Sequence, residues 1–281
     1  MLSRSLLKRA VKPSLTAVRF NRSEPWQGDN MMEIGSRAIF SEEHDMFRES
    51  VRKFFNDHVT MADCDRWEAN GMVERDIWLK AGEQGLLGVD TPEELGGLGG
   101  DFLMACIVSE EMSYNGCSAL GWPVHSDIVM PYLSKYGTAE QQALLPSMVS
   151  GEKIGCIAMT EPGTGSDLQG LKTTAKKDGD DWVINGSKVF ISNGYMADVA
   201  IIAAVTNPDA KNKATGITLF VVDTNTPGFS RGKLLKKIGL KGQDTSELFF
   251  EDLRVPGSAI LGGEEDGLNQ GFVYLMQELA R

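Results

Sequence analysis

Residues 158–170 read AMTEPGTGSDLQG, and this segment decides how the rest of the chain is interpreted. It continues a strand-like run at 155–160 and is dense in small residues. Because glycines carry no side chain, the backbone here could approach a planar or phosphorylated ligand closely. Thr160 and Ser166 add hydroxyl groups, and each main-chain N–H is a hydrogen-bond donor. Taken alone, the segment predicts a tight loop that could hold a ligand, but a structural turn explains it equally well.

Two familiar glycine motifs do not fit this segment. A phosphate-binding P-loop requires Lys followed by Ser or Thr after its glycines, and neither follows here. The dinucleotide-binding fingerprint requires a glycine three residues after Gly165, where Leu168 stands. The run at 171–177 is strand-like rather than helical. A nicotinamide-dependent dehydrogenase is therefore disfavoured.

Downstream, the chain is a succession of short strand-like runs. Asn185-Gly186 between two such runs predicts a hairpin, because a type I′ turn needs positive φ at both positions. The sequence KDGDD at 177–181 predicts another turn. No helical pattern separates the strands, which indicates a mostly antiparallel β domain over 151–262 rather than a doubly wound sheet. The predicted strands are 155–160, 171–177, 181–185, 187–192, 198–205, 217–223 and 246–251.

Upstream, residues 40–150 have helical periodicity. Ser41 is a candidate N-cap, and acidic residues follow it in the first turn, which suits the helix dipole. Thr138, with Gln141 three residues later, has the capping-box pattern. Besides the helix after Ser41, the predicted helices are 76–87, 102–114, 124–135 and 138–149.

The first 23 residues differ from the rest of the chain in charge. They contain several Lys and Arg and no acid, whereas the whole chain has a net charge of −11. A basic, Ser-containing start of this kind is typical of a mitochondrial transit peptide, and a disordered basic tail is the alternative. We expect a transit peptide at 1–23 and a linker at 24–39. The acidic remainder offers no electrostatic basis for binding nucleic acid.

The cysteines and histidines do not indicate a metal site. The chain has 4 cysteines and 3 histidines, and no CxxC pair or metal-ligand spacing occurs among them. Scattered cysteines are typical of buried small hydrophobic residues in a reducing compartment. No apolar run reaches the roughly 18 residues that a membrane span needs.

A last predicted helix begins at Asp266. Nothing in the sequence terminates its pattern before Arg281. We expect a chain that is truncated at its C-terminus, and the alternative is a terminal helix that docks back on the first domain. The apolar stripe of this helix consists of Leu268, Phe272, Leu275, Met276 and Leu279.

Four segments, in order, resemble the acyl-CoA dehydrogenase family. The segment 158–170 resembles its signature, with Thr164 where the family usually has a smaller residue. The resemblance runs from about residue 40 to the end, and the sequence is most similar to the long-chain mitochondrial members of the family. The other three segments are TPEELGG at 91–97, NGSKVFISNG at 185–194, and GLKGQDTSELFF at 239–250 followed by Val255-Pro256.

This resemblance implies an α+β multidomain fold. An N-terminal all-α helical domain at 40–150 is followed by a mostly antiparallel, β-barrel-like domain at 151–262. Residues 263–281 are then the start of a C-terminal helical bundle that is missing from the chain.

The resemblance also implies a flavoprotein of mitochondrial fatty acid β-oxidation. In the family, a base removes the α proton of a fatty acyl-CoA, and a hydride leaves the β carbon for the FAD, which gives a trans-2-enoyl-CoA. Ser166 is further implied to contact the acyl-CoA, and the family often has Trp where Phe190 stands. The implied cofactor-binding residues are Met159, Thr160, Gly165, Ser166, Phe190, Ile191 and Ser192.

The catalytic base is expected beyond Arg281. In the family it is a glutamate, either near the far C-terminus or on the helix after the β domain, just past this position. Glu278 lies on that helix but does not match the motif, so no catalytic residue is nominated, and residues 1–281 alone are expected to be inactive. The resemblance further implies electron-transfer flavoprotein as a partner, a homotetramer and the mitochondrial matrix. A non-catalytic binding or assembly protein of the same family is the alternative.

Overall fold

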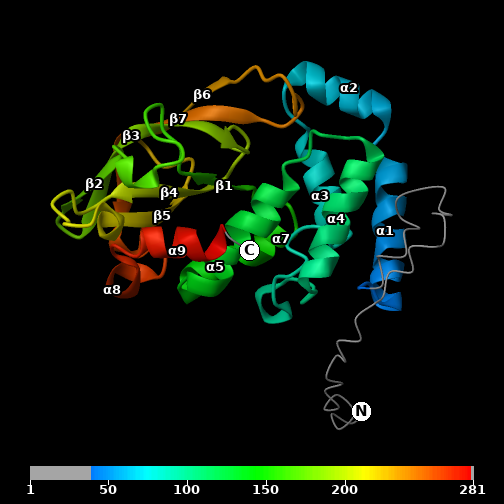
Figure 1. Cartoon of the computed structure of the whole chain (residues 1–281), viewed down its shortest axis with the longest axis horizontal. Coiled ribbons are helices and arrows are strands. Elements are labelled where there is room, and N and C mark those ends of the chain that lie inside the picture. The colour runs from blue at the N-terminus through cyan, green and yellow to red at the C-terminus, as the bar shows by residue number, and fades with distance from the viewer. Residues whose placement is uncertain (1–38, 280–281) are drawn as a thin grey trace, which may run out of the picture. The chain divides into compact units, whose positions relative to one another are not determined.

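The computed structural model describes residues 39–279, and the chain from Glu42 onward forms one compact unit (Figure 1). The expected transit peptide at 1–23, and nearly all of the linker at 24–39, lie outside the described residues. Helices make up the first part of the unit and strands the second, as the sequence predicts. The domain boundaries themselves stay predictions.

The helical part is built around two long helices that pack on each other. Helix α1 places Val51 and Phe55 in the core, and α1 lies against α4. Arg52 of α1 binds the buried Glu111 of α4 through two hydrogen bonds of 2.8 and 2.9 Å. The helices are α1 (Glu42–His58), α2 (Met61–Asn70), α3 (Arg75–Glu83), α4 (Phe102–Asn115), a π-helical turn (Val124–Val129), α5 (Met130–Tyr136), α6 (Ala139–Gln142) and α7 (Leu145–Val149).

Capping residues explain where two of these helices begin. The predicted capping box of Thr138 and Gln141 is present at α6, although the predicted helix over 138–149 is divided into α6 and α7. Helix α2 was not predicted, because its only clear signal is a second box in which Thr60 and Asp63 cap each other.

The strands form one curled, mixed sheet of seven strands in the order β1-β4-β2-β3-β7-β6, with β5 also on β4. Four of the pairings are antiparallel, which confirms the predicted character of the sheet, and β4 runs parallel to β1 and β2. The strands are β1 (Gly155–Ala158), β2 (Thr174–Asp178), β3 (Asp181–Ser192), β4 (Val199–Val205), β5 (Ile217–Asp223), β6 (Phe229–Leu234) and β7 (Thr245–Pro256).

The predicted hairpin at Asn185-Gly186 is wrong, because β3 runs through both residues without turning. Asn185 instead supports a bulge in β7: its side chain accepts from the Asp252 N–H (2.9 Å) and donates to the Asp252 carboxylate (3.1 Å). Gly186 is needed for close approach, since a Cβ there would lie 2.7 Å from the Cα of Thr173. The turn predicted at 177–181 is present between β2 and β3.

The helix predicted from Asp266 is interrupted. It consists of α8 (Gly263–Gly267) and α9 (Gly271–Glu278), separated at Asn269, which adopts a left-handed conformation with φ of 63°. Helix α9 contacts β5 and α5 (Figure 1). Leu275 is fully buried there, whereas Met276 and Leu279 of the predicted apolar stripe are exposed.

Candidate functional site

The signature segment leaves β1 and folds into a loop that binds its own backbone. The N–H and C=O of Glu161 pair with those of Thr164 at 2.9 and 3.1 Å. The Thr164 hydroxyl donates to the carbonyl of Gly170 at 2.9 Å. The residue at which this sequence departs from the family pattern therefore adds a hydrogen bond across the loop.

A buried ion pair joins this loop to the sheet. The Nζ of Lys188 on β3 donates to the Glu161 carboxylate at 2.9 Å and to the Met159 carbonyl at 3.0 Å. The same carboxylate accepts from the N–H groups of Lys172 (2.7 Å) and Thr173 (3.0 Å), which lead into β2. The side chains of Lys188 and Glu161 are only 0% and 5% exposed. One ion pair thus ties together the end of β1, the start of β2 and the middle of β3.

The two charges perturb each other and are perturbed by burial. Burial lowers the pKa of Lys188 to about 8, and the Glu161 carboxylate opposes this change. Burial alone would raise the pKa of Glu161, but the charge of Lys188, together with the hydrogen bonds from Lys188, Thr173 and Lys172, lowers it. Both groups are therefore charged at neutral pH.

A bulge in β3 turns Phe190 outward, next to the loop. The strand register shifts between Lys188 and Ile191, and Phe190 has a positive φ of 61°. Its ring is 67% exposed, while Val189 and Ile191 on either side are buried. The Val189 N–H donates to the carbonyl of Thr160 at 2.9 Å, so the bulge and the loop are bonded to each other. Bulges commonly re-aim a side chain in this way.

The structure brings most of the predicted cofactor-binding residues to these two segments. Met159 and Thr160 are half-buried at the start of the loop, and Gly165 and Ser166 are exposed on it. The Ile191 side chain packs in the core of the sheet, so only its main chain could reach a ligand.

Polar groups available to a ligand lie on the same segments. Within residues 39–279, the hydroxyls of Thr160, Ser166 and Ser192 have no hydrogen-bond partner. Ser246 of β7, opposite Ile191 in the strand register, has a hydroxyl that is also unpaired among the described residues, but this side chain is fully buried and is not open to a ligand. An exposed aromatic ring, an open glycine loop and free hydroxyls fit the flat, polar-edged ring system of a flavin.

Sequence reasoning did not assign roles to Glu161, Lys188 or Asn193. Asn193 adopts a positive φ of 60° and donates to the carbonyls of Gly121 (2.9 Å) and Gly155 (3.3 Å). All three lie inside the segments that carry the family resemblance. The one local signal was a lysine at an inward position of a strand, where an unpaired charge would be costly.

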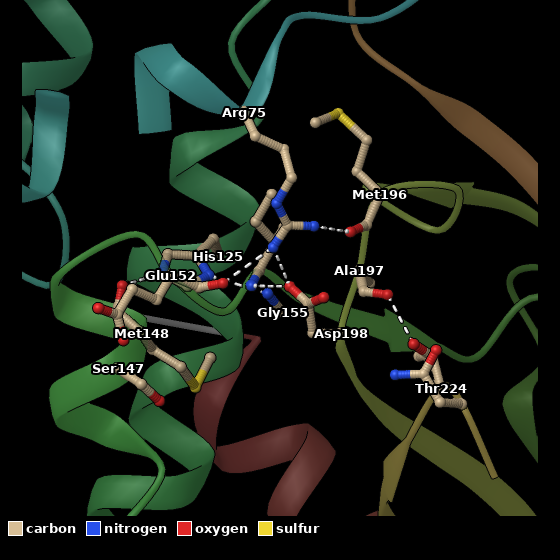
Figure 2. Close-up of polar contacts among 12 residues, drawn as sticks. Arg75, His125, Ser147, Met148, Glu152, Gly155, Met196, Ala197, Asp198 and Thr224 are labelled. Atoms are coloured by element: carbon tan, nitrogen blue, oxygen red, sulfur yellow. Dashed lines mark hydrogen bonds and ion pairs between the residues drawn. The ribbon is translucent and has the colours of Figure 1, made fainter. Parts of the chain in front are cut away.

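A second polar network holds β1 from the other side, where the helices meet the sheet (Figure 2). Arg75 of α3 donates to the carbonyls of Met196 (3.1 Å) and Glu152 (2.9 Å) and pairs with Asp198. Asp198 also accepts from the N–H of Ile154 at 2.8 Å. This network fixes the entry to β1, and the signature loop leaves the other end of that strand.

His125 completes this joint. Its Nδ1 accepts from the N–H of Gly155 at 2.9 Å, and its Nε2 lies 3.1 Å from the carbonyl of Met148, to which it donates (Figure 2). The ring is fully buried, and this burial lowers the pKa of His125 to about 4. The imidazole is thus neutral and structural at physiological pH.

Other kinds of site are not found in the described part of the chain. No group of three or more His, Cys, Asp or Glu in residues 39–279 could hold a metal ion. The cysteines in this range are free thiols. No helix within the same range is long and apolar enough to span a bilayer.

Two family profiles match the chain in succession: the acyl-CoA dehydrogenase N-terminal domain over 41–152 and the acyl-CoA dehydrogenase middle domain over 156–253. The chain belongs to the acyl-CoA dehydrogenase family.

Among curated proteins, the long-chain specific acyl-CoA dehydrogenase, mitochondrial, of Sus scrofa is 56% identical over 259 residues, which are 92% of this chain and 59% of that protein. The chain thus spans about three-fifths of the length of the relatives it matches. Among solved structures, an acyl-CoA dehydrogenase from Geobacillus kaustophilus has a TM-score of 0.82 and 46% identity over 86% of this chain and 63% of its own. An acyl-CoA dehydrogenase from Bacillus anthracis, complexed with FAD, has a TM-score of 0.76 and 31% identity over 85% of this chain and 40% of its own.

Proposed function

We propose that this chain supplies the flavin-binding wall of an FAD-dependent acyl-CoA dehydrogenase that converts long-chain fatty acyl-CoA to trans-2-enoyl-CoA. The observation that carries the proposal is the bonding of the signature loop to the β3 bulge, which places Phe190 beside a glycine loop with free hydroxyls. Its relatives support the reaction class, since the matched mammalian proteins are long-chain specific. The related structure that contains FAD supports the cofactor.

Each residue of this wall has a distinct task. The exposed ring of Phe190 packs against the flat isoalloxazine, and the hydroxyls of Thr160 and Ser192 hydrogen-bond to its polar edge. Gly165, where an added Cβ would meet no other group within 4 Å, and Ser166 border the acyl-CoA. The FAD supplies the acceptor for the hydride, and the protein orients the reactants and excludes water. Because Phe lacks an indole N–H, position 190 contributes packing and no hydrogen bond.

We assign the proton-abstracting base to none of the described residues. Glu278 is the nearest candidate by sequence, but its carboxylate accepts from Lys135 at 2.7 Å and from Tyr136 at 2.7 Å, and it is 3% exposed. Its carboxylate is bonded to an ammonium and a phenol and is closed to solvent, so it is not placed to meet a ligand. The base is therefore expected on the part of the relatives' length that this chain does not span.

The partners and location follow from the same proposal. Electrons pass to electron-transfer flavoprotein, the complete protein is a homotetramer, and it works in the mitochondrial matrix. The relatives named as mitochondrial support a mitochondrial location.

The decisive experiment uses the full-length protein expressed with riboflavin available. We expect a yellow protein that holds FAD and reduces a dye with long-chain acyl-CoA faster than with short-chain acyl-CoA. Phe190→Ala should weaken FAD binding, and Phe102→Ala, an exposed aromatic on α4, serves as its matched control. A colourless protein that binds no FAD would refute the proposal. Bound FAD without acyl-CoA oxidation would favour the non-catalytic alternative.

A further inference from the structure

The Glu161–Lys188 pair lies directly behind the residues that the proposed function assigns to the flavin. Lys188 is followed on β3 by Val189 and the outward-facing Phe190. One of its two acceptors is the carbonyl of Met159, the first residue of the signature loop. The pair therefore connects the two segments of the wall from the inside, although neither of its side chains is exposed to a ligand.

We propose that Glu161 and Lys188 are positioning residues that hold the signature loop and the Phe190 bulge at the separation a flavin requires. This inference rests on the proposed flavin site. Lys188 lies on β3, and its Nζ donates a hydrogen bond to the Met159 carbonyl. This bond sets the distance between Met159 and β3. Glu161 fixes the loop to the start of β2 through the N–H groups of Lys172 and Thr173.

Stability alone does not account for a buried charge pair at this position. Removing two charges from water costs about as much free energy as their attraction returns, and apolar residues of similar volume often serve stability as well. What an apolar pair cannot do is bind the Met159 carbonyl and two backbone N–H groups in fixed directions. Without these bonds, the Val189–Thr160 hydrogen bond is the one hydrogen bond left between bulge and loop among residues 39–279.

The charge of Lys188 gives the proposal a second, independent signature. Within residues 39–279, Glu161 is the only ionisable group within ion-pair distance of its Nζ. Loss of the proton removes the ion pair, and the neutral amine, which keeps two N–H groups, donates weaker hydrogen bonds to Glu161 and Met159. Because the pKa of Lys188 is about 8, flavin binding should weaken as the pH rises from 7 to 9.

The test uses the full-length protein and measures the FAD dissociation constant alongside the melting temperature. The main variant is the double substitution Glu161→Gln/Lys188→Met, which removes both charges and leaves neither uncompensated. The matched control is Arg75→Met, which removes an ion pair and two carbonyl contacts at the opposite end of β1. We expect the double variant to bind FAD on the order of ten- to a hundredfold more weakly, and the control to bind it as the unsubstituted protein does.

The pH profile separates positioning from a general loss of stability. The unsubstituted protein and Arg75→Met should both lose FAD affinity between pH 7 and 9, whereas the double variant should have a flat profile. Unchanged FAD affinity in the double variant, or a pH profile that it shares with the unsubstituted protein, would overturn the inference. If the unsubstituted protein binds no FAD, the proposed function itself has failed, which is a different result.

Discussion

Two ion pairs hold opposite ends of β1, and they differ in burial. Lys188 and Glu161, behind the signature loop, are 0% and 5% exposed, whereas Arg75 and Asp198, at the joint with the helices, are 44% and 28% exposed. Water screens the second pair and can replace its bonds, so it adds little to stability. The first pair has no such substitute. The comparison indicates that buried charge is used where geometry must be fixed and exposed charge where two surfaces only need to stay together.

The largest effect should come from breaking the buried pair on one side. Lys188→Ala leaves the Glu161 carboxylate buried without its counter-ion, and this should lower the free energy of unfolding by about 3–5 kcal/mol. Urea unfolding followed by tryptophan fluorescence measures the change. The double variant Glu161→Gln/Lys188→Met should lose clearly less. If the single and double variants lose equal stability, the two groups do not act as a pair.

How much of this site the sequence predicts depends on the range of the interaction. The glycine loop and the β3 segment were recognisable because their residues are contiguous in the chain. The Glu161–Lys188 bond spans 27 positions, and no local pattern indicates that the two side chains meet. The Asn185-Gly186 signal was misread, because Asn185 instead binds Asp252 at the β7 bulge and Gly186 instead allows the close approach of Thr173. Helix α2 was not predicted, because it lacks a broad apolar stripe and buries mainly Cys64 and Trp67.

The second prediction concerns the joint, where His125 adds a pH dependence. The pKa of His125 is about 4 in the folded protein and 6.5 in an unperturbed histidine, so the unfolded chain binds more protons between these values. Stability is fully present above pH 6.5 and falls as the pH is lowered to 4, by about 3 kcal/mol. Chemical denaturation at pH 7, 5.5 and 4.5 measures this.

The matched control for His125 is His125→Gln, which does not titrate in this range. The free energy of unfolding of this variant should be lower at pH 7, because the hydrogen bonds to Gly155 and Met148 are weakened. The part of the stability loss at low pH that comes from His125 should disappear. An identical acid loss in both proteins would contradict the assignment and would place the sensitive groups elsewhere.

The third prediction concerns the close contact between Gly186 and Thr173, next to the buried pair. In Gly186→Ala, the new Cβ would meet backbone and side-chain atoms of Thr173, whose N–H is bound by Glu161. Backbone atoms cannot move aside cheaply, so we expect a loss of about 1–3 kcal/mol in the free energy of unfolding. Gly239→Ala, whose new Cβ would meet no other group within 4 Å, should change little. Equal melting temperatures for the two variants would show that β3 can shift away from Thr173.

The smallest effect should come from the exposed pair. Arg75→Met removes bonds to Asp198, Glu152 and Met196, yet the guanidinium is 44% exposed and water can take over these carbonyls. We expect the free energy of unfolding to fall by at most about 1 kcal/mol. This difference should be smaller still in high salt, because exposed charges are screened. Urea unfolding at low and high salt measures both quantities. A fall in the free energy of unfolding that is independent of salt and as large as that of Lys188→Ala would mean that exposure does not distinguish the two pairs. The joint would then fix the geometry of β1 as firmly as the signature loop does.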